Sequence, residues 1–267
     1  QIPCYNEEDN LPVVLSTLPR EVPGFDRVEW LVVDDGSVDR TVERAQAGGV
    51  DHLVRLPHHQ GLARAFMAGI HASLRAGADV IVTTDADNQY RSECIPDLVQ
   101  PILDGNAEMV IGARPIRQMR HFSRTKKTLQ KLGSWVVRLA SNTQVPDAPS
   151  GFRAMSREAA LQLNVYNDYT YTLETIIQAG QKGIPVTWVA IQTNGDLRPS
   201  RLLKSIPSYV WKSLLTILKV FVIYKPFLFF MSIGSALLFL GTLIGVRFLF
   251  FYFTGQGGGH VQSLILA

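Results

Sequence analysis

The sequence predicts an α/β protein with a mostly parallel sheet and flanking helices, followed by an amphipathic segment and C-terminal transmembrane helices. Short β-branched runs alternate with helix-like segments over residues 1–196. Two of these runs end in acidic residues, and a charge-free apolar stretch follows later in the chain. The 267 residues are 46% hydrophobic and 18% charged, which excludes a disordered or collagen-like protein.

Strands and helices are expected to alternate along residues 1–196. Four runs rich in apolar or β-branched residues are predicted strands: Val28–Val33, Asp79–Thr84, Met109–Ala113 and Val186–Gln192. Four amphipathic segments are predicted helices: Glu8–Leu18, Thr41–Ala47, Gly61–Arg75 and Ile95–Leu103. This alternation predicts parallel pairing, and parallel sheets bind ligands at the carboxyl ends of their strands.

Charge is divided along the chain. Residues 197–267 contain no Asp or Glu but seven Lys or Arg, which leaves 19 basic and 23 acidic residues in positions 1–196. Residues 109–146 also lack acids and contain eight cations: Arg114, Arg117, Arg120, Arg124, Lys126, Lys127, Lys131 and Arg138. Such stretches are either solvated surface or contacts for an anionic partner, such as a phosphate or a membrane surface.

Residues 226–254 are predicted to form a transmembrane helix. The apolar run covers about 27 residues, or ~40 Å of helix, which is enough to span a ~30 Å hydrocarbon core. Cations crowd its N-terminal side, so the positive-inside rule places residues 1–225 in the cytosol. Residues 255–267 are expected to form a turn and the start of a second span. We therefore expect a multi-pass membrane protein, and a chain that is a fragment beginning inside a strand.

Residues 197–225 separate the predicted cytosolic domain, 1–196, from the predicted span. Polar residues recur there at spacings of three and four with apolar residues between them, which predicts an amphipathic helix beginning near Pro207. The helix either packs on the domain or lies in the membrane interface. We favour the interface, because the helix runs directly into the predicted span.

Two acidic motifs follow predicted strands. In D-D-G-S, residues 34–37, a carboxylate either caps the next helix or contacts a base or ribose. In D-A-D-N-Q, residues 85–89, two carboxylates one residue apart repel each other and lose hydration, so they require a cation or a donor. Such oxygen ligands suit Mg²⁺ or Mn²⁺.

Motifs for several other chemistries are missing. His58 and His59 have no Cys or His partner at metal-ligand spacing, so they are interpreted as surface or loop-packing residues. The sequence has no P-loop, dinucleotide-binding or G-x-S-x-G motif, and no framework for nucleic-acid binding. A haloacid dehalogenase-type phosphatase requires Thr or Val where Gln89 stands, and the Q-x-x-R-W motif of processive polysaccharide synthases is absent.

Six motifs in order resemble the family 2 glycosyltransferases, which have the GT-A fold. They are P-C-Y-N-E-E at 3–8, D-D-G-S at 34–37, G-L-A at 61–63, D-A-D-N-Q at 85–89, G-A-R at 112–114 and S-G-F-R at 150–153. With R-P-S-R-L at 198–202 and the apolar tail, the chain is most similar to the polyprenyl-phosphate sugar transferases, the group typified by dolichyl-phosphate mannose synthase. The resemblance covers nearly the whole chain and departs from the pattern at the short first strand.

The resemblance implies inverting, metal-dependent transfer of one sugar from GDP-mannose or a UDP-hexose to a polyprenyl phosphate. Nucleotide-sugar contacts are implied for Pro3, Tyr5, Glu7, Val33, Asp35, Asp85 and Ala86. A divalent cation, Mg²⁺ or Mn²⁺, is implied at Asp85, Asp87 and Gln89, and catalytic roles are implied for Asp87, Asp147 and Arg114. Contacts to the lipid phosphate or the diphosphate are implied for Arg198, Ser200 and Arg201.

Several alternatives stay open. A membrane-anchored nucleotide-sugar binder without activity would carry the same binding residues, and another family 2 transferase would use a different acceptor. Asp147 is a base, a group that positions the acceptor or sugar, or a loop cap. A lipid phosphate is already largely ionised at neutral pH and needs little help from a base. The expected partners are a nucleotide-sugar, a polyprenyl phosphate and the membrane, with a homo-oligomer left open and nucleic acid excluded.

Overall fold

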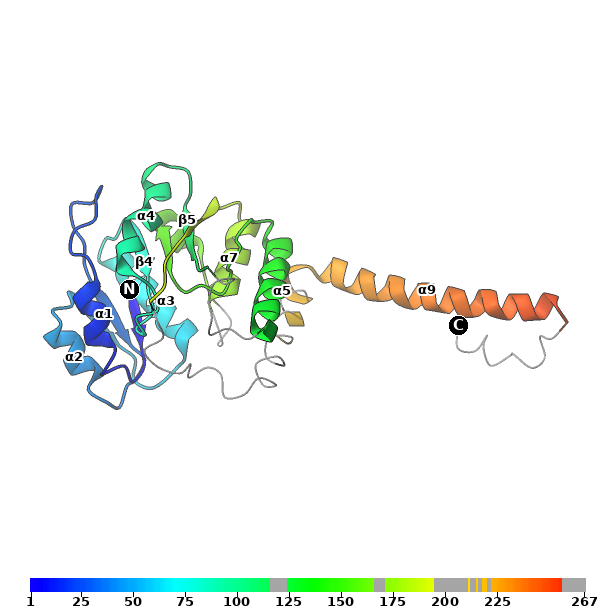
Figure 1. Ribbon diagram of the computed structural model, residues 1–267, viewed down its shortest axis with the longest axis horizontal. Coiled ribbons are helices and arrows are strands. Elements are labelled where there is room, and N and C mark those ends of the chain that lie inside the picture. Colours follow the sequence, from blue (N-terminus) through cyan, green and yellow to red (C-terminus); the bar gives the residue numbers. More distant parts are fainter. Residues whose placement is uncertain are drawn as a thin grey trace. The chain divides into compact units, whose positions relative to one another are not determined.

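The structure is a computed structural model that describes residues 1–115, 124–165, 171–194 and 222–255, with residues 211, 215, 218 and 219 (Figure 1). The chain divides into two compact units, Gln1–Leu214 and Leu215–Ala267. Most of the predicted amphipathic segment and nearly all of the predicted second span lie outside the described residues.

In the described part of the first unit, seven strands form two sheets. β1 (Ile2–Cys4), β2 (Leu31–Asp34) and β3 (His52–Arg55) form a parallel sheet in that order. The second sheet has the order β4-β6-β5-β7, formed by β4 (Val80–Thr83), β6 (Arg153–Ser156), β5 (Met109–Ala113) and β7 (Val186–Ala190).

Gln1 joins the two sheets. Its backbone nitrogen donates to the carbonyl oxygen of Val82 at 2.6 Å, and its carbonyl oxygen accepts from the N–H of Thr84 at 3.1 Å. β1 therefore lies beside β4, and the two sheets are joined there. The carboxyl ends of β1, β2 and β4 lie at the same edge of the joined sheets.

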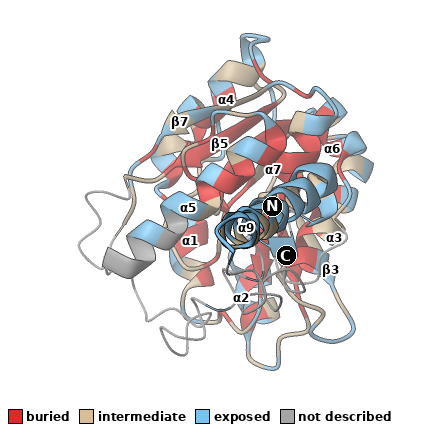
Figure 2. Ribbon diagram, turned by 90° about the vertical axis from the view of Figure 1, so that its right-hand side faces the viewer, coloured by how far each residue is buried: buried red, intermediate tan, exposed pale blue. Residues whose placement is uncertain are grey.

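The described helices of the first unit are α1 (Leu11–Thr17), α2 (Thr41–Ala47), α3 (Leu62–Arg75), α4 (Ile95–Leu103), α5 (Arg124–Ser141), α6 (Arg157–Gln162) and α7 (Thr172–Gln181), with a 3₁₀ turn, η1 (Ser92–Cys94). α3 packs against β1 and β2, α4 packs against β5 and β6, and α5 packs against α7. Helices thus cover both sheets, and the buried residues concentrate in the strands and the helix sides that face them (Figure 2).

The strand sequences follow from this burial. β2 and β5 are buried at every position, because helices and neighbouring strands exclude water from both faces. Such strands need a continuous apolar run rather than an alternating pattern. Leu98, Val110 and Phe152 belong to one core cluster, which joins α4 to the second sheet. Ile2 and Val32 belong to a second cluster, in the first sheet.

The predicted α/β fold is confirmed, with differences at element ends. α2, α4 and β5 have the predicted bounds. α1 begins at Leu11 rather than Glu8, because Pro12 occupies its first turn and Asn6, with φ 53°, turns the chain ahead of it. β2 begins at Leu31 rather than Val28.

β3 and β6 are not predicted from the sequence. β6 lies between β4 and β5 and is antiparallel to both, so three of the five described strand pairs are parallel. Its four residues, R-A-M-S, include a fully buried Arg153 and carry no alternating pattern. The predicted mostly parallel sheet therefore holds, with one reversed strand inside it.

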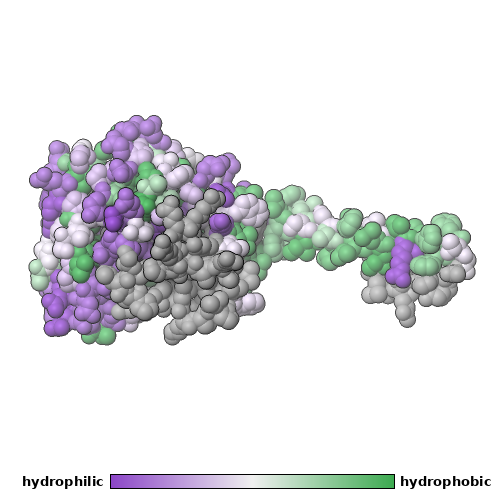
Figure 3. Space-filling model, in the orientation of Figure 1, coloured by the Kyte–Doolittle hydropathy of each residue, from purple (hydrophilic) through white to green (hydrophobic). Residues whose placement is uncertain are grey.

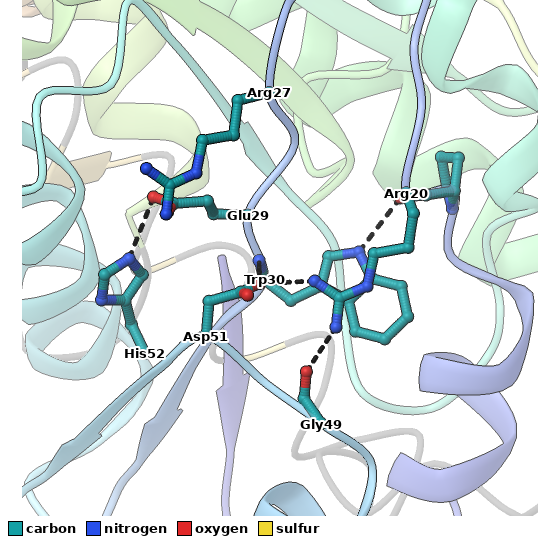
Figure 4. Close-up of polar contacts among 8 residues, drawn as sticks. Arg20, Arg27, Glu29, Trp30, Gly49, Asp51 and His52 are labelled. Carbon is teal, nitrogen blue, oxygen red and sulfur yellow. Dashed lines mark hydrogen bonds and ion pairs between the residues drawn. The ribbon is translucent and has the colours of Figure 1, made fainter.

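Polar contacts fix the chain where it enters β2 and β3 (Figure 4). Arg20 contacts Asp51 at 2.5 Å, and its guanidinium lies 3.5 Å from the centre of the Trp30 ring. Glu29 accepts from Arg27 and lies 3.0 Å from the His52 ring nitrogen. Because these pairs are partly exposed, each contributes little stability. They order the starts of the two strands, at the end opposite to the D-D-G-S motif.

The second unit contains α9 (Pro226–Phe253), a helix of 28 residues with a mean hydropathy of 2.2 in its most apolar stretch. None of its residues is buried, and apolar side chains dominate its surface (Figure 3). Among the described residues it is the one helix long and apolar enough to cross a bilayer. Its length of about 42 Å exceeds a ~30 Å hydrocarbon core, so a tilted crossing would fit. The crossing of a membrane, once or several times, stays a prediction.

Candidate functional site

Most of the predicted site residues that the structure describes lie at the carboxyl ends of strands. Tyr5 and Glu7 follow β1, Asp35 follows β2, Asp85 follows β4 and Arg114 follows β5. Because β1 and β2 are parallel and Gln1 joins β1 to β4, three of these ends share one edge. The charges of Glu7 and Arg114 both shift the pKa of Asp85. The residues that follow β1, β4 and β5 are therefore close enough to interact electrostatically.

The first two motifs are hydrogen-bonded to each other. Pro3 and Val33 are paired in register between β1 and β2, and both are buried, so they fix the positions of the two strand ends. The N–H of Asn6 donates to Ser37 Oγ at 2.9 Å, and Asn6 Oδ1 accepts from the N–H of Val38 at 2.9 Å. These bonds hold the loop after β1 against the loop after β2.

The two carboxylates of the D-D-G-S motif have different environments. Asp34 is buried, and its Oδ1 accepts from the N–H of Ser37 at 3.1 Å, which caps the turn. Asp35 Oδ1 accepts from the N–H of Gln60 at 2.7 Å, and Oδ2 accepts from the N–H of Gly61 at 2.9 Å. Asp34 thus has the capping role, whereas Asp35 lies against the loop that precedes α3.

His59 is a site residue that the sequence does not reveal. Its Nδ1 lies 2.8 Å from Asp35 Oδ2, and its ring stacks on Tyr5 with 3.9 Å between ring centres and 24° between planes. The sequence predicts only surface or loop packing for this residue. Its placement depends on β3, which carries the loop to Asp35, and β3 has no clear sequence pattern. The available signal is the G-L-A motif at 61–63, which begins two residues after His59, where the loop enters α3.

Glu7 and Ala86 fix the neighbouring loops. The N–H of Glu7 donates to Thr41 Oγ1 at 2.8 Å, and Glu7 Oε2 accepts from Asn10 Nδ2 at 2.8 Å. Ala86 is buried in the core cluster that contains Ile2. It therefore anchors the D-A-D-N-Q motif to the core and offers a ligand only its backbone.

Asp85 and Asp87 form an acidic pair at the end of β4. Burial, and then the charge of Asp87, raise the pKa of Asp85 to about 7, although Arg114 and Arg153 oppose the shift. Asp87 Oδ1 accepts from the N–H of Gln89 at 3.1 Å. Ionising Asp85 is thus costly without a compensating cation, and a divalent cation would supply one.

The acidic pair fits a divalent cation that is also bound by a ligand. The described residues contain no group of three His, Cys, Asp or Glu side chains able to hold a metal ion. Mg²⁺ and similar ions, however, commonly use one or two carboxylates together with substrate phosphates and water. Asp85 and Asp87 meet that need. The Oε1 atom of Gln89, the third predicted ligand, accepts from Arg114 Nη1 at 3.1 Å.

Arg114 is held by Asp147 in a bidentate ion pair. Its Nε lies 2.7 Å from Asp147 Oδ2, and its Nη2 lies 3.1 Å from Asp147 Oδ1. The two side chains are only 9% and 1% exposed. Burial alone would lower the pKa of Arg114, but Tyr90 and Asp147 outweigh it and raise the pKa. Arg114 therefore stays a cation with a fixed orientation beside the acidic pair.

The S-G-F-R motif packs against Asp85 and is held in place by hydrogen bonds. The N–H of Gly151 donates to the Tyr90 hydroxyl at 3.0 Å, and its carbonyl oxygen accepts from Tyr171 at 3.3 Å. Arg153 is buried, donates to Ser150 and Thr175, and has a pKa lowered by burial. A Cβ placed on Gly151 would lie 2.8 Å from Asp85 Oδ2. Only glycine leaves room there for the carboxylate.

Replacing Gly151 with Ala is expected to lower activity about a hundredfold without unfolding the protein. The added methyl group would displace the Asp85 carboxylate, and displacements of this size in a site cost on that order. Gly133→Ala in α5 is the control, because its Cβ would meet no atom within 4 Å. Sugar transfer and thermal unfolding of both variants check the prediction, and equal activities would contradict it.

Two other features lie elsewhere. A cavity of about 380 Å³ borders Gln1, Phe25 and Val99 near the strand starts, and none of the predicted site residues lines it. The predicted phosphate contacts Arg198, Ser200 and Arg201 fall outside the described residues, so their placement stays a prediction.

The fold and the site define an α/β transferase of the GT-A class. The sequence profile of Glycosyl transferase family 2 matches residues 1–163. The chain belongs to this family and is a glycosyltransferase, which confirms the resemblance noted from its motifs.

Named relatives cover most of the chain. It is 30% identical to the undecaprenyl-phosphate mannosyltransferase of Micrococcus luteus, over 70% of this chain and 82% of that protein. It is 29% identical to the UDP-N-acetylglucosamine–dolichyl-phosphate N-acetylglucosaminyltransferase of Methanococcus voltae, over 72% of this chain and 83% of that protein.

Solved structures support the fold. Glucosyl-3-phosphoglycerate synthase from Mycobacterium tuberculosis, in complex with Mn²⁺, UDP-glucose and phosphoglyceric acid, matches with a TM-score of 0.61 and 23% identity. The match covers 81% of this chain and 77% of that one. At this identity the likeness shows a shared GT-A fold.

Proposed function

We propose that this glycosyltransferase transfers a single sugar, with inversion, from a nucleotide-sugar to a polyprenyl phosphate at the cytosolic face of a membrane. The observation that carries the proposal is the buried Arg114–Asp147 pair beside the acidic pair Asp85 and Asp87. A fixed cation next to a cation-binding acidic pair suits a diphosphate leaving group. The two relatives described above are named for undecaprenyl-phosphate and dolichyl-phosphate, which supports a lipid phosphate as acceptor.

The base and ribose of the donor bind at the β1–β2 edge in this proposal. Tyr5 offers an aromatic face, and Asp35 offers a carboxylate fixed by two backbone N–H groups. Glu7 is held in place by Thr41 and Asn10. Pro3 and Val33 hold the ends of β1 and β2 in register. The relatives are named for different sugars, mannose and N-acetylglucosamine, so they support no choice between GDP and UDP donors.

The diphosphate lies between Arg114 and the acidic pair in this proposal. Mg²⁺ or Mn²⁺ at Asp85 and Asp87, when bound, supplies positive charge that stabilises the leaving diphosphate. Arg114 donates to the same group, and Asp147 fixes its guanidinium so that little reorganisation is needed as charge develops. Gln89 holds Arg114 from its other side.

The acceptor phosphate needs little activation. It is already largely ionised at neutral pH, so no base has to remove a proton. Asp147 is committed to Arg114 through both of its carboxylate oxygens. We therefore assign Asp147 to positioning Arg114, and Arg198, Ser200 and Arg201 to binding the acceptor phosphate.

Two features support a membrane acceptor. α9 has the length and hydropathy of a span. α5 exposes Leu132, Trp135 and Leu139, which lie on one face of the helix at spacings of three and four, within the acid-free stretch 109–146. Apolar and aromatic residues flanked by cations are typical of surfaces that rest on a bilayer. We accordingly place residues 1–196 in the cytosol, 197–225 at the interface and 226–254 in the membrane.

Transfer of radiolabelled sugar to a polyprenyl phosphate tests the proposal. The full chain, in detergent with Mn²⁺, is incubated with GDP-mannose or UDP-linked sugars, and labelled lipid is extracted and counted. We expect labelled lipid with one donor class and none after EDTA treatment. Donor binding without transfer would favour the non-catalytic binder, and transfer only to a water-soluble acceptor would favour a different family 2 activity.

A further inference from the structure

One imidazole contacts two of the residues that the proposed function assigns to the base and ribose, Tyr5 and Asp35. The ring of His59 stacks on Tyr5 with 3.9 Å between ring centres, and its Nδ1 lies 2.8 Å from Asp35 Oδ2. A carboxylate only accepts hydrogen bonds, so Nδ1 carries a proton in this contact. A flat ring that stacks on an aromatic side chain and offers a ring N–H to a carboxylate has the recognition pattern of a nucleobase such as uracil or guanine.

The Asp35 carboxylate has little capacity left to accept further hydrogen bonds. Its carboxylate accepts from the N–H groups of Gln60 and Gly61 as well as from His59, and its side chain is only 3% exposed. Both amide donors belong to the backbone that leads into α3, so they stay in place. Among these three donors, only His59 can leave Asp35 by a side-chain rotation.

The backbone of His59 is tightly packed, whereas its side chain has room to rotate. Gly36 has φ 72°, and a Cβ there would lie 2.6 Å from the backbone nitrogen of His59 and 2.5 Å from the carbonyl carbon of His58. The two loops are therefore packed tightly through their backbones. The His59 side chain is 52% exposed, so its imidazole has open space into which to turn.

We infer that the His59 imidazole occupies the base subsite of the unliganded protein and is displaced when the donor nucleotide binds. The inference rests on the proposed function, because that function places the base and ribose against Tyr5 and Asp35. His59 then sets donor affinity: the apparent dissociation constant rises by the inverse of the fraction of molecules in which the subsite is open. An imidazole that fills the subsite about nine-tenths of the time weakens binding about tenfold.

Calorimetric titration of the full chain with UDP and with GDP, in detergent with Mn²⁺, tests this inference. His59→Ala is expected to lower the Kd of whichever diphosphate binds by about tenfold. His59→Phe keeps the stacking but loses the N–H, so its Kd should fall less. His59→Gln is a second variant that removes the ring. His58→Ala is the matched control, because that neighbouring side chain is exposed, and its Kd should equal that of the wild type.

The outcomes separate the inference from the proposed function. A Kd that rises or stays unchanged in both His59→Ala and His59→Gln overturns the inference. The imidazole would then contribute to binding of the nucleobase, or have no effect on it. The donor site still stands in that case if Tyr5→Ala and Asp35→Asn weaken binding. If the wild type and the His59 variants bind neither diphosphate, the donor assignment fails and the inference fails with it.

Discussion

Asp87→Asn is expected to remove nearly all sugar transfer, by about a thousandfold, while the protein stays folded. A carboxamide is a poor ligand for a hard cation, and loss of a Lewis-acid ion removes several kcal/mol of transition-state stabilisation, at about tenfold per 1.36 kcal/mol. Asp87 also raises the pKa of its buried neighbour Asp85 through its charge. Removing that charge makes ionised Asp85 less costly, so the metal-free variant should be at least as stable as the wild type.

Thermal unfolding gives a readout independent of activity. A cation that binds only the folded state raises the melting temperature, and Mn²⁺ should do so for the wild type but not for Asp87→Asn. Asp104→Asn is the matched control, because Asp104 is exposed at the end of α4. Full transfer by Asp87→Asn, or an unchanged Mn²⁺ effect on its melting temperature, would remove Asp87 from the metal site.

Asp147→Asn is expected to lower transfer about a hundredfold and to destabilise the fold by about 3–5 kcal/mol. Breaking one side of a buried ion pair leaves the other charge without compensation, and this loss is typically of that size. Arg114 is 9% exposed and donates to Asp147 through Nε and Nη2, so it would lose both its charge partner and its orientation. Urea unfolding and transfer rates at saturating donor check these two effects.

A double-mutant cycle shows whether Asp147 acts through Arg114. If Asp147 only positions Arg114, then Arg114→Gln and the double variant Arg114→Gln/Asp147→Asn should have similar transfer rates. The pH profile supplies a second test. A base must be ionised to act, so loss of the acidic limb of the pH–rate profile in Asp147→Asn alone would show that Asp147 is a base and contradict the positioning role.

Much of the fold follows from local patterns. β5 and α4 are found where apolar runs and amphipathic spacing predict them, and α9 covers the apolar run that includes the charge-free residues 227–245. These elements bury or expose many apolar side chains in one stretch of chain, so the hydrophobic effect leaves a clear trace in the sequence. β3 and β6 are short, and their pairing depends on strands distant in sequence. Their sequences therefore carry little signal.

Part of the candidate site can also be predicted from the sequence. Residue type and position after a strand point to the two carboxylates of D-A-D-N-Q as cation ligands, whereas the roles of Arg114 and Asp147 are implied only by the resemblance to a known family. Chemistry of this kind depends on residue type and on position after a strand, which one chain can show. The same is true of the family, whose profile matches residues 1–163.

The contacts among these groups appear only when the chain is folded. Asp147 binds Arg114, Gly151 makes room for Asp85, and His59 reaches Asp35 across a loop from β3. Folding also separates Asp34, which caps a turn, from the adjacent Asp35, which faces the site. Side-chain contacts across the sheet depend on strand order and loop packing, which are set by the burial of the whole core rather than by neighbouring residues.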